Sequence, residues 1–194
     1  MTTIGLTGSL GTGKSTVLGF FERLGALTID TDKLVHEELR RNKDLKEKIK
    51  NIFGSDVFLK GQIERHKLAR KVFKSRPAVD KLNALIHPII KKRIIDFFKK
   101  QKGAKVVVVE VPLLFETDFY KLFDVTIGVA TDALHQRERL GAKYETGQTK
   151  ARIRWQLPLD EKLARCDFVI DNNKNKKETF NQVKLIMEEK KWKS

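Results

Sequence analysis

The chain has 194 residues, of which 40% are hydrophobic and 34% are charged, and its formal net charge is +15. This length suits one hydrophobic core, alone or with a smaller inserted lobe. No apolar run approaches the roughly 20 residues of a membrane span, and the first residues lack the pattern of a signal peptide. The composition therefore argues against a membrane-spanning or disordered chain, and it predicts a cytoplasmic globular protein.

A strand, a glycine-rich loop and a helix are predicted in that order at the start of the chain. Residues 3–7 are short and β-prone, and apolar residues from Val17 to Leu24 recur at helical spacing. Gly25 is a plausible helix terminator.

The loop between them has the sequence GSLGTGKS, from Gly8 to Ser15. It matches G-x-x-x-x-G-K-[ST], and it has the strand before and the helix after that the pattern requires. Glycines let backbone N–H groups surround an anion, Lys14 would contact the β and γ phosphates, and Ser15 would bind Mg²⁺. The loop therefore predicts a nucleoside triphosphate site, although it does not say what happens to the nucleotide.

Two carboxylates follow the second predicted strand, ALTID. Asp30 and Asp32 lie near its carboxyl end, which in an open parallel sheet lies near the phosphate loop. A kinase for an alcohol needs one carboxylate to take the proton of the acceptor hydroxyl, and Asp32 is our candidate, with Asp30 as a supporting or metal-water partner. The alternative is that one of them only caps the helix expected from Lys33, and the sequence alone does not decide between base and cap.

Three further strands and two interruptions are predicted after this point. AKVVVVEVPLLF is the candidate central strand, because four consecutive valines suit a strand that is covered on both faces, and residues 124–130 and 167–171 follow as two more strands. The segment 33–102 is charged and helical in pattern without a convincing strand, and about 141–152 is expected to form a lid. The fold class is therefore α/β, a doubly wound and mostly parallel five-stranded sheet with a helical insertion and a lid.

Four stretches in this order, GLTGSLGTGKST, IDTDKLVHE, LNALIHPII and VVVVEVPLLFE, resemble the dephospho-coenzyme A kinase family. The resemblance covers nearly the whole chain. It implies a P-loop kinase that transfers the γ-phosphoryl group of ATP to the ribose 3′-hydroxyl of dephospho-CoA in the last step of coenzyme A biosynthesis.

The resemblance also implies roles for individual residues. Asp32, Lys14, Arg139 and Lys143 would be catalytic. The residues implied to bind ATP are Gly8, Gly11, Thr12, Gly13, Lys14, Ser15 and Thr16, with Ser15 on the metal. The residues implied to bind the acceptor are Thr7, Asp32, Arg65, His87, Pro112, Leu113, Leu114 and Glu116.

The chain departs from the family pattern in its lid. The family usually has two arginines four residues apart, whereas this chain has Arg139 and then Lys143. Lysine lacks the planar fork of donors that lets arginine hold a phosphate through two hydrogen bonds. Arg137, Arg152 or Arg154 is therefore an alternative to Lys143 as the phosphate-binding residue of the lid.

The expected division of the chain follows from the same reasoning. Residues 1–32 and 103–194 would form the nucleotide-binding core, and 33–102 would bind the CoA end of the acceptor. The expected partners are ATP, Mg²⁺ and dephospho-CoA, with no membrane and no nucleic acid, in a monomer or small homo-oligomer. Two alternatives stay open: a different small-molecule kinase on the same fold, and a nucleic-acid-dependent P-loop ATPase suggested by the charge of +15. Cys166 is expected to be a small core residue.

Overall fold

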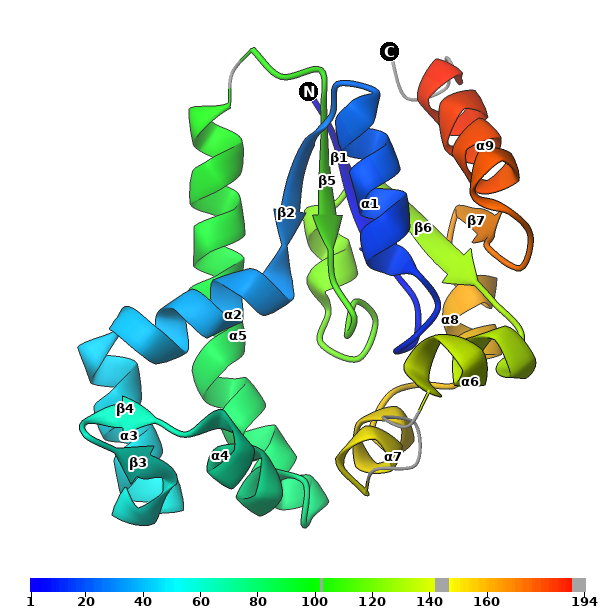
Figure 1. Ribbon diagram of the computed structural model, residues 1–194. Coiled ribbons are helices and arrows are strands. Elements are labelled where there is room, and N and C mark those ends of the chain that lie inside the picture. The colour runs from blue at the N-terminus through cyan, green and yellow to red at the C-terminus, as the bar shows by residue number, and fades with distance from the viewer. Residues whose placement is uncertain (102, 142–146, 190–194) are drawn as a thin grey trace.

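The computed structural model describes residues 1–101, 103–141 and 147–189, and its centre is a five-stranded sheet in which every pairing is parallel (Figure 1). Its strands are β1 (Thr2–Thr7), β2 (Leu27–Asp30), β5 (Val106–Glu110), β6 (Val125–Ala130) and β7 (Phe168–Asp171). They lie in the order β2-β5-β1-β6-β7. The predicted fold class is confirmed, whereas the prediction that the valine-rich strand is central is wrong, because β1 holds that place and β5 lies beside it.

Helices cover both faces of the sheet. The described helices are α1 (Lys14–Arg23), α2 (Thr31–Arg41), α3 (Lys43–Phe53), α4 (Arg65–Val72), α5 (Arg76–Lys100), α6 (Ala133–Leu140), α7 (Gly147–Arg154), α8 (Leu159–Ala164) and α9 (Lys176–Glu188), with 3-10 turns at Ser55–Val57 and Phe119–Leu122. Helices α1 and α9 lie together on one face, while α5 runs along the other (Figure 1). The valines of β5 alternate between these two cores: Val108 packs with α1, and Val107 and Val109 pack with α5.

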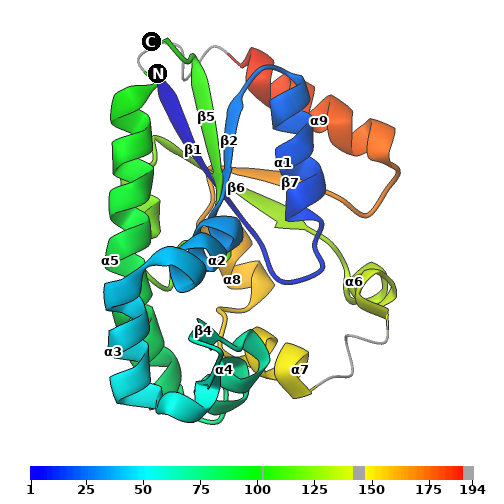
Figure 2. The same ribbon diagram turned by 60° about the vertical axis from the view of Figure 1, so that its left-hand side comes forward.

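Helical structure dominates the segment between β2 and β5. Helices α2, α3, α4 and the first half of α5 form a lobe at the carboxyl end of the sheet (Figure 2). This segment also contains an antiparallel pair, β3 (Phe58–Leu59) with β4 (Gln62–Ile63), which the sequence did not predict. The turn between these strands uses Lys60 and Gly61, both with positive φ, and a two-residue turn of this kind supports even very short strands.

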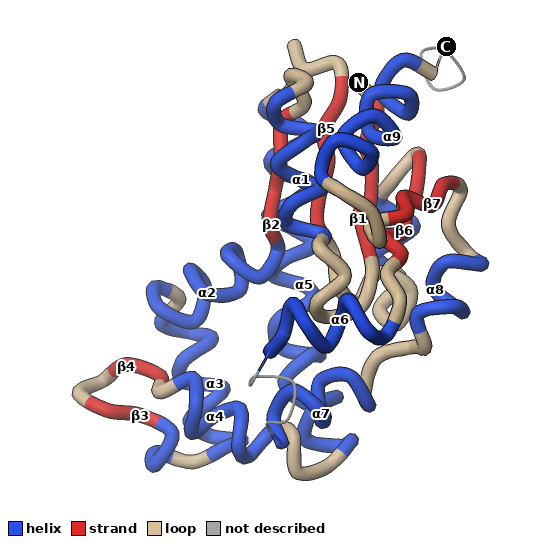
Figure 3. The backbone as a smooth tube through the Cα atoms, turned by 45° about the vertical axis from the view of Figure 1, so that its right-hand side comes forward, coloured by secondary structure: helices blue, strands red, loops and turns tan. Residues whose placement is uncertain are grey.

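Helix α7 lies beside the carboxyl end of the sheet, near the helical lobe (Figures 2 and 3). Of the predicted lid, residues 142–146 lie outside the described residues, Gly141 follows α6, and residues 147–152 belong to α7. None of the helices that the structure describes combines the length and the apolar character needed to cross a membrane.

Phe21 is the largest side chain that fixes α1 against the sheet, and it is completely buried. We expect Phe21→Ala to lower the free energy of unfolding by about 3–5 kcal/mol, because it removes an aromatic ring from a closed core. Chemical denaturation measures this loss. Leu185→Ala on α9 is the control, since that side chain is 67% exposed and its loss should change stability by less than about 0.5 kcal/mol; equal effects would contradict the packing described here.

Candidate active site

Near the end of the phosphate loop, only glycine fits at position 13. Gly13 is the N-cap of α1 with φ of 90°, and a Cβ atom there would collide with the side-chain amide of Asn172. Lys14 begins the helix, is buried, and donates from Nζ to the Ser9 carbonyl oxygen at 2.9 Å. The lysine ammonium and the N-terminal turn of α1 are therefore both held at the loop.

The two aspartates at the end of β2 and the start of α2 have different surroundings. Asp30 is the N-cap of α2, because its side chain accepts a hydrogen bond from the Lys33 amide at 3.2 Å. Helix α2 already begins at Thr31, so Asp32 lies in its first turn, where it is exposed and lines the pocket described below. The capping role thus falls on Asp30, and Asp32 belongs to the lining of the pocket.

Glu110 is a third carboxylate at this edge, and it is buried. It ends β5 and pairs in register with Asp30 of β2 and Leu6 of β1. Its Oε1 is 3.5 Å from the Ser15 hydroxyl, and its Oε2 has no hydrogen-bonding partner among the described residues. Burial raises the pKa of Glu110, and the neighbouring charges of Asp30 and Asp32 raise it further, whereas Lys14 and Ser15 oppose the shift.

A pocket of about 820 Å³ connects the phosphate loop with the helical lobe. The predicted site residues that line it are Gly11, Gly13, Lys14, Ser15, Thr16, Asp32, His87, Pro112, Leu113, Glu116 and Arg139. Four others, Thr7, Gly8, Thr12 and Leu114, are buried beneath or beside it and do not line it. Leu114 is fully buried within the core that α5 covers.

One wall of the pocket depends on the Pro112 carbonyl oxygen. It accepts hydrogen bonds from the Thr7 hydroxyl at 3.5 Å and from Lys162 Nζ at 2.6 Å. Lys162 is fully buried and pairs with Glu116 Oε1 at 2.8 Å. Burial lowers the pKa of Lys162, while the Glu116 carboxylate counteracts that shift. The segment after β5 is therefore fixed to both β1 and α8.

His87 lines the same pocket from α5. Its ring meets Phe119 edge-on at 5.6 Å, and burial together with Lys91 lowers its pKa to about 4. His87 is therefore neutral at pH 7. Pro88 follows inside the helix, where it removes a backbone hydrogen bond.

Arg65 lies apart from these residues. Its Nη1 is 2.9 Å from His36 Nδ1, and it lines a second pocket of about 720 Å³ within the helical lobe. The two pockets share the wall residues Val35, Val72, Phe73, Leu82 and Ile86.

Arg139 on α6 binds the phosphate loop. It donates to the Thr12 carbonyl oxygen at 3.1 Å and to the Asn172 carbonyl oxygen at 2.5 Å. Of the alternatives, Arg154 lies over the Trp155 ring at 5.5 Å. Lys143 and the side chain of Arg152 lie outside the described residues. In this structure Arg139 thus joins the loop to the end of β7.

Sequence reasoning missed Glu110, Lys162 and Asn172. The sequence could have identified Glu110, because a carboxylate at the end of a buried strand next to a phosphate loop occupies the same edge of the sheet as Asp30. The sequence gives no indication of the role of Lys162, because LDEKLA is typical of a solvated helix. Cys166, predicted to lie in the core, is half-buried and donates to the Lys162 carbonyl oxygen at 3.2 Å.

Comparison with known proteins gives consistent results. The family model described as dephospho-CoA kinase matches residues 2–178. The chain is 36% identical over 192 residues to the dephospho-CoA kinase of Aquifex aeolicus, covering 97% of both chains, and 36% identical over 195 residues to that of Bacillus cereus, covering 97% of this chain and 96% of the other.

Solved structures agree. A protein from Thermus thermophilus matches with a TM-score of 0.80 and 29% identity over 96% of both chains. The dephospho-CoA kinase of Campylobacter jejuni matches with a TM-score of 0.69 and 26% identity over 98% of this chain and 97% of the other. Shikimate kinase from Acinetobacter baumannii, at 15% identity and a TM-score of 0.54 over 96% of this chain and 91% of the other, shares the fold. The chain therefore belongs to the dephospho-CoA kinase family of ATP-using P-loop kinases.

Proposed function

We propose that this protein transfers the γ-phosphoryl group of ATP to the ribose 3′-hydroxyl of dephospho-CoA, which gives coenzyme A and ADP in the last step of coenzyme A biosynthesis. The observation that carries the proposal is that Lys14, Asp32 and Glu110 gather at one end of a pocket large enough for a nucleotide-sized acceptor. In the proposed step the acceptor oxygen bonds to the γ-phosphorus, the bond to the β,γ-bridging oxygen breaks, and Asp32 takes the hydroxyl proton.

On the donor side, backbone N–H groups of the loop and the Lys14 ammonium would bind the phosphates. The residues proposed for this role are Gly8, Gly11, Thr12, Gly13, Lys14, Ser15 and Thr16. Arg139 lines the pocket and would add positive charge there, and a direct hydrogen bond to a phosphate would require its guanidinium to leave the Thr12 and Asn172 carbonyl oxygens. Lys143 stays a predicted contributor.

We infer that Mg²⁺ accompanies ATP. Among the described residues no group of three or more His, Cys, Asp or Glu side chains could hold a metal ion alone, so the nucleotide phosphates would supply ligands. The donor set fits, because Ser15 offers a hydroxyl and Glu110 a buried oxygen without another partner. When bound, Mg²⁺ would neutralise phosphate charge.

On the acceptor side, we propose that Asp32, His87, Pro112, Leu113 and Glu116 surround the ribose end, with the buried Thr7 and Leu114 supporting this wall from behind. Arg65 and the second pocket would serve the far end of the acceptor, in line with the proposed division into a core of 1–32 and 103–194 and an acceptor-binding segment of 33–102. The cytoplasmic location, the absence of a nucleic-acid partner and the oligomeric state stay predictions.

The direct test mixes purified protein, ATP and Mg²⁺ with dephospho-CoA and follows coenzyme A by chromatography. The proposal predicts coenzyme A and ADP in equal amounts. Conversion of adenosine or other alcohols instead would favour a different kinase, and ATP hydrolysis that depends on RNA or DNA would favour the nucleic-acid ATPase.

Asp32→Asn tests the proposed proton acceptor. We expect kcat to fall by about 10²–10⁴-fold while ATP affinity stays unchanged, because an amide cannot take the proton and the phosphate loop is untouched. Steady-state kinetics and ATP titration give both numbers. Asp44→Asn, in the first turn of α3, is the matched control and should keep full activity; an active Asp32 variant would refute the assignment.

Glu110→Gln should separate stability from activity. Burial raises the pKa of Glu110, so its charged form destabilises the folded state as the pH rises through that pKa. The glutamine variant should therefore be more stable than the parent at pH 8, with the difference vanishing below a pH of about 4, where the carboxyl is protonated in both states.

The same variant should need about 10–100-fold more Mg²⁺ for half-maximal activity, because the metal loses a supporting oxygen. Thermal unfolding and Mg²⁺ titration are the two measurements. A variant with unchanged Mg²⁺ dependence would remove Glu110 from the proposed site.

A further inference from the structure

The side-chain amide of Asn172 contacts the phosphate loop from the carboxyl end of β7. Its Nδ2 donates to the Thr12 carbonyl oxygen at 2.8 Å, although the two residues are 160 positions apart in the sequence. A carbonyl oxygen can only accept, so the nitrogen of the amide and not its oxygen faces Thr12. Asn172 is 6% exposed and lies outside the described lining of the pocket, so it acts on the loop and not on a ligand.

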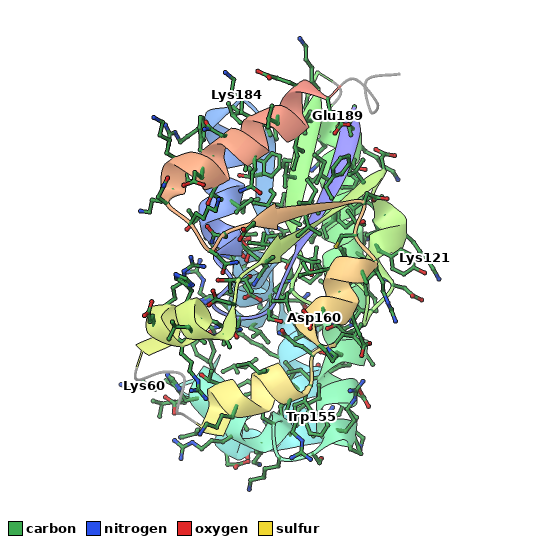
Figure 4. All side chains as sticks on the ribbon, turned by 90° about the vertical axis from the view of Figure 1, so that its right-hand side faces the viewer. Lys60, Lys121, Trp155, Asp160, Lys184 and Glu189 are labelled. Carbon is green, nitrogen blue, oxygen red and sulfur yellow. The ribbon has the colours of Figure 1, made fainter. Side chains whose placement is uncertain are left out.

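Asn172 is held in turn by the sheet and by α9. Its backbone N–H group donates to the Ala130 carbonyl oxygen at 2.9 Å, which continues the pairing of β6 with β7. Its Oδ1 accepts from the hydroxyl of Thr179, a fully buried residue of α9, at 3.0 Å. Figure 4 shows α9 across the upper part of the molecule, with Lys184 of that helix labelled. The amide therefore reaches the loop from a fixed position, and the Thr179 hydroxyl sets its rotation.

The contact fixes the direction of the peptide group between Thr12 and Gly13. In a trans peptide, which is the form of this bond, the carbonyl oxygen and the N–H group point in opposite directions. Because the Thr12 oxygen is held against Asn172, the Gly13 N–H group points away from Asn172. Gly13 lines the pocket, and loops of this pattern bind phosphates through such N–H groups. The direction of this one peptide group therefore bears on phosphate binding.

The Thr12 carbonyl oxygen has a second donor of a different kind. Arg139 Nη1 donates to it at 3.1 Å, but Arg139 is exposed and lines the pocket. A bound phosphate would compete with this oxygen for the guanidinium, because hydrogen bonds between two charged groups are the stronger ones. The amide of Asn172 is buried and neutral, so it would keep its place on the Thr12 oxygen if the guanidinium turned to the ligand.

We infer that Asn172 is a positioning residue for the donor nucleotide. It holds the peptide between Thr12 and Gly13 in the direction that lets the Gly13 N–H group bind the β-phosphate. Thr179 acts one step further back, through the amide that it orients. The inference concerns the donor nucleotide alone, so it does not depend on which acceptor the protein phosphorylates.

Binding of ADP and of AMP to Asn172→Leu tests the inference, because only ADP carries a β-phosphate. Leucine keeps a branched side chain of similar shape and removes the donor. Displacement of a fluorescent ATP analogue at a fixed Mg²⁺ concentration, without any acceptor, measures both dissociation constants at the donor site. We expect Kd for ADP to rise about tenfold, the effect of one lost hydrogen bond, and Kd for AMP to change by less than about twofold.

Thr179→Val tests the path through the amide, because valine keeps the shape of threonine and removes the hydroxyl. It should raise Kd for ADP about threefold in the parent protein, since the Asn172 amide is then less firmly oriented. In the Asn172→Leu background it should add nothing, because the group through which it acts is gone. Effects that multiply in the double variant would contradict this path.

Thr126→Val is the matched control. Thr126 is also buried, and its hydroxyl donates to Asp167 Oδ2 at 2.7 Å near the start of β6, away from the phosphate loop. This variant should lower the melting temperature and leave both dissociation constants within about twofold of the parent values.

Two results would overturn the inference: unchanged ADP binding by a folded Asn172→Leu protein, or an equal rise of Kd for ADP and AMP. Thermal unfolding confirms that the variant is folded. If Asn172→Leu does not fold, Thr179→Val alone decides, because equal changes for ADP and AMP in that variant would also refute the role. Failure of the parent protein to phosphorylate dephospho-CoA would overturn the proposed function and leave these binding constants unaffected.

Discussion

The parallel pairing of β2, β5 and β1 is the constraint on which the rest of the site depends. Its register sets Asp30 opposite Glu110 and Glu110 opposite Leu6, so β2 and β5 end at the same level and β1 continues only to Thr7. The phosphate loop follows β1, Asp30 ends β2 and Asp32 follows it, and the Pro112 wall follows β5. Groups that are distant in the sequence therefore meet at one edge because parallel strands all point the same way.

This edge holds charge in buried positions. Glu110 is 6% exposed and Lys162 is fully buried. Burial raises the pKa of Glu110 and lowers the pKa of Lys162, and both shifts favour the neutral form of the side chain. Lys162 is compensated by Glu116 and the Pro112 carbonyl oxygen, whereas one oxygen of Glu110 has no partner in the described part of the chain. Uncompensated buried charge is costly, so its presence beside the phosphate loop indicates a site built for a charged ligand rather than for stability.

Much of the fold could be predicted because its signals are local. The valines of β5 and the apolar spacing of α1 can each be recognised within a few residues. The glycine-rich loop between a strand and a helix is likewise recognised from its own sequence. The order of the strands was not available, because β1 and β5 pair across about a hundred residues and each reads as a buried strand. The β3–β4 hairpin was missed because two-residue strands carry almost no pattern.

The same distinction between local patterns and long-range contacts applies to the site. Residue spacing predicted the phosphate loop and both aspartates, but it could not decide which aspartate caps the helix and which acts as the base. The structure decides the first point, because α2 starts at Thr31 and Asp30 is its N-cap. The Lys162–Glu116 ion pair and the hydrogen bond from the Leu157 amide to Glu116 join segments about 40 residues apart, and neither produces a recognisable pattern in its own stretch of sequence. Such contacts become visible only when the chain is folded.

The central claim is that donor and acceptor meet in one pocket and that the phosphoryl group passes directly between them. Cys166, whose thiol pKa is raised to about 12 by burial, does not line that pocket and is not placed to act as an intermediate carrier. Stereochemical analysis with ATP made chiral at the γ-phosphorus by oxygen isotopes tests the claim most directly. A single in-line transfer predicts inverted configuration in the 3′-phosphate of the product, whereas retention would mean that a phosphorylated enzyme forms first and would contradict this account.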